Sequence, residues 1–89
     1  EVIPDPITRA VAKQQRRSIS ACEAANPAAR GTYSAKLLVR PDGSVANLVT
    51  HHTLSNAMGE CLSRALRGWR FPERHSELDG VASFAVAYP

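Results

Sequence analysis

The sequence predicts a small α+β domain with the element order α-β-β-α-β, in which two helices pack on one face of a three-stranded antiparallel sheet. Apolar residues recur at helical spacing in two segments, near residues 7–26 and 56–68. Between them lie two alternating stretches joined by a tight turn, and an apolar stretch, Val81–Tyr88, closes the chain.

The chain has 89 residues, which fits a single domain over 1–89. Its net charge of +3 is a mild excess; nucleic-acid domains usually concentrate more basic charge on one face, and a moderate positive balance also suits an acidic protein partner or simple solubility. No apolar run approaches the roughly 18 residues of a membrane span, and no signal peptide opens the chain. Since Glu1 is not a natural start residue, we expect a domain that belongs to a longer protein.

The first helix is expected to start with Asp5 as its cap and Pro6 at its first position, and to run to about Asn26, before Pro27. Pro4 and Pro6 argue against regular strand pairing of the segment that precedes it. Its apolar arc holds Ile7, Val11, Ile19 and Cys22, and its charged arc holds Arg9, Lys13, Arg16, Arg17 and Glu23.

A hairpin follows. Residues 32–40 alternate, so that Tyr33, Ala35, Leu37 and Val39 should face the core. Pro41-Asp42-Gly43 has the composition of a tight turn. The returning strand, 44–52, changes parity between Val45 and Leu48, which predicts a β-bulge.

The second helix, capped by Ser55 or Asn56, should end near Gly68 and deliver large side chains to the core. The core residues expected here are Leu62, Leu66, Trp69 and Phe71. After Pro72 and a polar loop, the third strand should contain Val81, Ala82, Ser83, Phe84, Ala85, Val86, Ala87 and Tyr88. Three strands leave at least one exposed edge, which can template another chain.

Cys22 and Cys61 both lie on predicted inward faces, so the two sulfurs can meet if the helices pack on one side of the sheet. Two buried reduced thiols are one possibility, and a disulfide is favoured if the compartment is oxidising. Neither cysteine has the exposed, basic surroundings of a nucleophile.

No catalytic constellation, metal site, cofactor site or small-molecule site is predicted. His51 and His52 are adjacent on a strand and should face opposite sides, so they cannot form one metal site together. A basic strip of Arg64, Arg67, Arg70 and Arg74 is typical of a solvated helix face, and nucleic-acid binding is its alternative reading.

Two motifs point to a known family. The run from Gly31 to Pro72 contains Asp42-Gly43-Ser44-Val45 in the turn and ends in Trp69-Arg70-Phe71-Pro72. It resembles the C-terminal domain of TonB-type energy transducers. With one cysteine in each helix, the chain looks like the AgmX/PglI C-terminal type, some members of which are tied to gliding motility. It departs from the family at His51-His52 and at Ser83-Phe84-Ala85 in the last strand.

The resemblance implies a TonB-like sheet with the first strand in the middle, and a periplasmic domain of an inner-membrane-anchored protein. It implies a non-enzymatic domain that grips an outer-membrane or periplasmic envelope protein and passes on force from a proton-driven motor. The partner would pair with the edge of Val81–Tyr88 by β-augmentation. A structural domain that dimerises through the same edge is the alternative.

Overall fold

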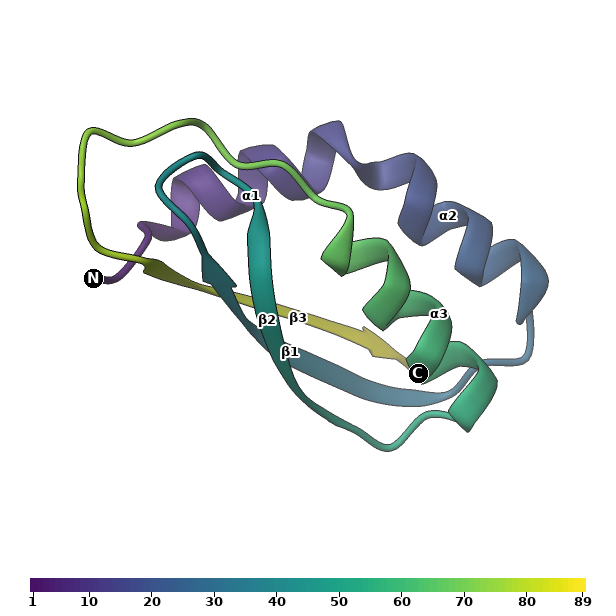
Figure 1. The fold of residues 1–89 in the computed structure, drawn as a ribbon. Helices are drawn as coiled ribbons and strands as arrows, with labels where there is room; N and C mark the ends of the chain where they lie inside the picture. Colours follow the sequence, from purple (N-terminus) through teal and green to yellow (C-terminus); the bar gives the residue numbers. More distant parts are fainter.

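A computed structural model describes all residues from Glu1 to Pro89. The elements are α1 (Asp5–Gln14), α2 (Arg16–Ala25), β1 (Gly31–Val39), β2 (Val45–His52), α3 (Asn56–Arg67) and β3 (Gly80–Tyr88). The strands form one antiparallel sheet in the order β2-β1-β3, so that β1 is central, as expected. All three helices lie on the same side of this sheet (Figure 1).

The first helical segment differs from the prediction, because it forms two helices rather than one, and the observed order is α-α-β-β-α-β. Gln15 breaks the helix with φ −99° and ψ 17°, and its carbonyl accepts hydrogen bonds from the amide and the hydroxyl of Ser18. Residues 13–18 carry no apolar side chain, so no packing holds this turn in a helical conformation. The cap was also predicted wrongly: Pro4 is the N-cap residue and Asp5 is already helical.

The hairpin follows the prediction closely. Leu37 pairs with Leu48, but Leu38 pairs with Asn47 and Val39 with Val45, so Ala46 is the extra residue of the expected bulge. The turn places Gly43 at φ +92°, in the left-handed region that favours glycine. A side chain there would also meet the carbonyl of Phe71, whose amide donates to the Gly43 carbonyl.

The core lies between the helices and the inner face of the sheet. Leu37, Leu62 and Leu66 have no exposed surface, and Trp69 and Phe71 are buried as predicted. The Trp69 indole packs edge-to-face on Phe84, with 5.2 Å between ring centroids, and its Nε1 donates to the Ser18 hydroxyl at 3.4 Å. The residues after α3 therefore join the helical layer to β3.

A disulfide between Cys22 and Cys61 links α2 to α3. It settles the choice that the sequence left open, since the domain has no free cysteine. Ser55 caps α3, accepting a hydrogen bond from the Met58 amide. No helix has the length and apolar character needed to cross a membrane.

Candidate functional site: the outer edge of the last strand

β3 is an edge strand with one side unpaired for most of its length. It pairs with β1 from Gly80 to Tyr88, and no further strand lies beyond it. In an antiparallel pair, alternate residues direct their amide and carbonyl groups toward the partner, and the others direct them away. Val81 directs both groups outward, so Ser83, Ala85 and Ala87 do the same. These three residues present free hydrogen-bonding groups to the surroundings.

The N-terminal segment occupies the beginning of this edge. The Val81 amide donates to the Glu1 carbonyl at 2.8 Å, and the Ile3 amide donates to the Val81 carbonyl at 2.9 Å. This is a single parallel bridge between Val2 and Val81. The expectation that the whole of Val81–Tyr88 is free is therefore wrong at Val81.

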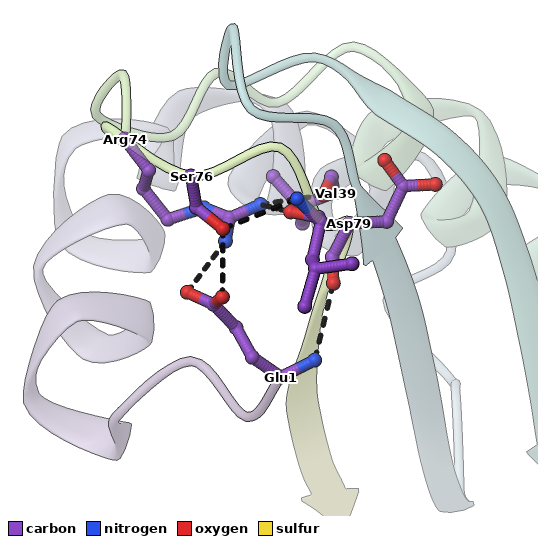
Figure 2. A network of polar contacts seen from close by, with 6 residues as sticks. Glu1, Val39, Arg74, Ser76 and Asp79 are labelled. Carbon is purple, nitrogen blue, oxygen red and sulfur yellow. Dashed lines mark hydrogen bonds and ion pairs between the residues drawn. The ribbon is translucent and has the colours of Figure 1, made fainter.

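Arg74 holds that segment in place (Figure 2). Its guanidinium pairs with the Glu1 carboxylate at 2.9 Å and donates to the carbonyls of Val39 and Leu78. The Ser76 hydroxyl donates to the other Glu1 carboxylate oxygen, and this bond, with those from Arg74, lowers the pKa of Glu1. The polar loop after α3 thereby holds the N-terminal segment against Val81, so the free part of β3 begins after that residue.

A groove runs beside the free part of β3. Its volume is about 780 Å³, and it lies between the edge residues 83–86 and the facing sides of α1 and α2. Apolar side chains from both walls line it, namely Ala12, Ile19, Phe84 and Val86. An extended segment paired to Ser83 and Ala85 would project alternate side chains toward this groove.

The helical wall of the groove carries charge in a simple order. Arg9, Lys13 and Arg16 lie along it, with Asp5 and Glu23 also lining the groove. α1 begins beside the start of β3, since Val2 pairs with Val81, and Glu23 lies near Tyr88 at its end. The helical layer therefore follows β3 in the same direction, with three cations between two carboxylates.

Tyr88 lies at the far end of the same edge. Its hydroxyl is buried without a hydrogen-bond partner. Burial raises the pKa of Tyr88 to about 12, and the neighbouring Glu23 carboxylate contributes to the rise. The phenol is therefore neutral at any physiological pH and retains its proton as a hydrogen-bond donor.

The opposite edge of the sheet, formed by β2, is less open. On β2, Leu48 directs its amide outward. Thr32 accepts a hydrogen bond from Thr53 on the β2 side, so Lys36 also faces β2 and bonds to Val49, and the next residue, Leu48, faces the other way. That amide donates to the Asn47 side-chain oxygen at 2.8 Å, so it is already satisfied. The bulge at Ala46 further interrupts the edge. Thr50 and His52 still direct their groups outward, so the free stretch of β2 is shorter than that of Ser83, Ala85 and Ala87, and β3 is the longer template for an added strand.

The other sites considered from the sequence fall elsewhere. The basic strip does not assemble: Arg64 and Arg67 line one polar depression beside His52, whereas Arg74 turns to the N-terminal segment. The His52 ring stacks on Tyr33, at 6.0 Å between centroids, and covers Gly59, where a side chain would collide with it. No group of three His, Cys, Asp or Glu side chains is placed to hold a metal ion.

Sequence reasoning missed the cationic wall as part of a site. It placed Arg9, Lys13 and Arg16 on one exposed arc but assigned them no partner, because their position over β3 depends on the fold. The spacing of four and three residues was the available signal.

No family model, no curated protein and no solved structure matches this chain.

Proposed function

We propose that this chain is a TonB-type periplasmic binding domain that holds an envelope protein by β-augmentation along β3. It transmits force from an inner-membrane, proton-driven motor to that outer-envelope partner, for transport or for gliding motility. The observation that carries the proposal is the row of outward amide and carbonyl groups at Ser83, Ala85 and Ala87, bordered by a groove.

Two further features support the proposal. The Cys22–Cys61 disulfide fits an oxidising compartment such as the periplasm. The turn motif and the Trp69-to-Phe71 segment, on which the resemblance rests, are both structural parts of the domain, because Gly43 and Phe71 pack on each other. We assign the domain no catalytic role, no cofactor and no nucleic-acid partner.

Amide hydrogen exchange tests the proposal most directly. In the free domain, the amides of Ser83, Ala85 and Ala87 should exchange fast, whereas those of Phe84 and Val86, which pair with β1, should be protected. Synthetic peptides that tile the periplasm-facing segments of outer-membrane proteins from the same organism serve as probes. A binding peptide should slow exchange at the three outward amides.

A matched pair of variants separates backbone pairing from side-chain contact. Ala85→Pro removes one outward amide without breaking a bond to β1, whereas Ala85→Ser retains the amide. The proline variant should lose peptide binding and the serine variant should keep it. Binding that survives Ala85→Pro, or that leaves the three amides in fast exchange, would refute pairing at this edge.

The alternative function is a structural domain that dimerises through the same edge, because an unpaired strand can also accept β3 of a second copy. Sedimentation over a wide range of concentration distinguishes the two. A tight dimer that protects the amides of Ser83 and Ala85 in the absence of any peptide would establish the alternative and overturn the proposal.

A further inference from the structure

We infer that the segment bound along β3 is acidic, with carboxylate side chains at alternate positions directed toward α1 and α2. This inference rests on the proposed function and specifies the chemistry of its partner. Its basis is the geometry of the groove: one wall offers the free strand edge at Ser83 and Ala85, and the other presents Arg9 and Lys13.

The spacing of the cations fits the spacing of side chains on a strand. Arg9 and Lys13 are four residues apart on α1, which corresponds to about 6 Å along the helix. Alternate residues of an extended segment lie about 6.6–6.8 Å apart and point to the same side. Carboxylates at positions i and i+2 of the added strand therefore meet Arg9 and Lys13, and Arg16 continues the row.

The same charges argue against a second copy of this chain as the occupant. Two β3 strands paired antiparallel about a two-fold axis would place both helical layers on the same side of the joined sheet. Arg9, Lys13 and Arg16 of one copy would then face the same cations of the other. Like charges at such a junction oppose association, whereas an acidic segment neutralises them.

The ends of the groove limit where the acidic residues lie. Asp5 and Glu23 flank the three cations, so carboxylates of the occupant belong in the middle of the paired stretch and not at its ends. Side chains between the charged positions point to the other face of the sheet, where Ser83 and Ala85 are exposed, so the groove does not restrict them. The inferred motif is thus a short extended segment with an acidic, alternating centre.

Fluorescence anisotropy with three labelled peptides of equal length tests the inference. The first has glutamates at alternate central positions between threonine and valine, the second has the same composition with its glutamates adjacent, and the third has lysines in place of the glutamates. The alternating acidic peptide should bind at least about fivefold more tightly than either of the others, and added salt should weaken it.

Charge reversal on the wall provides the matched comparison. Lys13→Glu, or Arg9→Glu if the first variant does not fold, should weaken the acidic peptide by about fivefold and strengthen the lysine peptide. Arg17→Glu makes the same change in net charge at an exposed residue of α2 that does not line the groove. It should alter binding by less than about twofold, because salt screens the more distant charge.

The outcomes separate this inference from the proposed function. If Ala85→Pro abolishes binding of every peptide while Lys13→Glu changes none, edge pairing stands and the acidic preference is refuted. If Lys13→Glu weakens the acidic peptide while Ala85→Pro leaves it unchanged, the segment binds by charge alone and edge pairing is refuted. Equal affinity for the acidic and lysine peptides, or no binding of the acidic peptide, overturns the inference.

Discussion

Removing the disulfide is the perturbation whose effect the structure predicts most directly. The double variant Cys22→Ala/Cys61→Ala removes a covalent bond between residues that are 39 positions apart in sequence. In the chain-entropy treatment, closing a loop of that length stabilises the folded state by about 4 kcal/mol. Small domains have a total free energy of unfolding of about 5–15 kcal/mol, so this loss is a large part of the whole.

Urea unfolding followed by tryptophan fluorescence measures this loss. Trp69 is the only tryptophan and is 1% exposed, so its emission reports the core. With an m value of about 1.5 kcal/mol/M, a loss of about 4 kcal/mol lowers the midpoint by about 2.7 M. The m value of the variant should rise, because its unfolded chain is no longer cross-linked.

Two controls isolate the bond itself. A reductant should lower the midpoint of the unmodified domain to that of the double variant and leave the variant unchanged. Ser20→Ala, an exposed change on the same helix as Cys22, should leave the midpoint in place. A fall of less than about 1 kcal/mol in the double variant would refute the chain-entropy account of this disulfide.

Four further predictions each concern a single residue. Gly43→Ala should destabilise the domain by about 2 kcal/mol or more in urea unfolding, since the φ of Gly43 is +92° and the new side chain meets the Phe71 carbonyl. Gly68→Ala should stabilise it by about 0.4–1 kcal/mol in the same assay, because the new Cβ makes only an ordinary contact, 3.6 Å from the Ala65 carbonyl oxygen. Arg74→Met should cost about 1–3 kcal/mol, because two carbonyls lose their donor, and should speed amide exchange at the start of β3. Burial raises the pKa of Tyr88 to about 12, above its ordinary 10.0, so between pH 10 and 12 the folded state binds more protons than the unfolded state. The free energy of unfolding should therefore fall as the pH rises from 10 to 12, and in thermal melts Tyr88→Phe should reduce this loss of stability.

Much of the sheet follows from local patterns. The alternation from Tyr33 to Val39 gives the buried face of β1, and the change of parity between Val45 and Leu48 gives the bulge. These features depend on side-chain period and turn chemistry, both of which are readable in a short window. The cap of α3 at Ser55 is local in the same sense.

The features that sequence reasoning missed depend on contacts between residues far apart in sequence, or on the lack of apolar residues near a helix break. The break at Gln15 follows no glycine or proline, and only the hydrogen bonds of Ser18 and the lack of apolar residues nearby mark it. Arg74 was assigned to a surface strip because its carbonyl partner at Val39 is 35 residues away in sequence. The N-terminal bridge to Val81 was missed because Pro4 and Pro6 signalled only an irregular segment.

The sequence could predict that the last strand lies at an edge of the sheet, but not which of its residues face outward or which charges lie beside it. The apolar stretch after the polar loop indicated an edge strand, and β3 is one. The register of β3 with β1 decides which of its residues face outward. The cationic wall depends on the way α1 and α2 run alongside β3. Neither is encoded in the strand itself.

The satisfied Leu48 amide and the bulge at Ala46 have a consequence for many copies held close together. If both edges of the sheet were equally free to pair, β3 of one copy could pair with β2 of the next. Such a contact would repeat without closing, as in a fibre. Because β2 keeps outward groups only at Thr50 and His52, a contact between β3 of one copy and β2 of the next would be short. Crowded copies are therefore less prone to head-to-tail growth than a sheet with two long free edges would be, and each copy retains β3 for a partner.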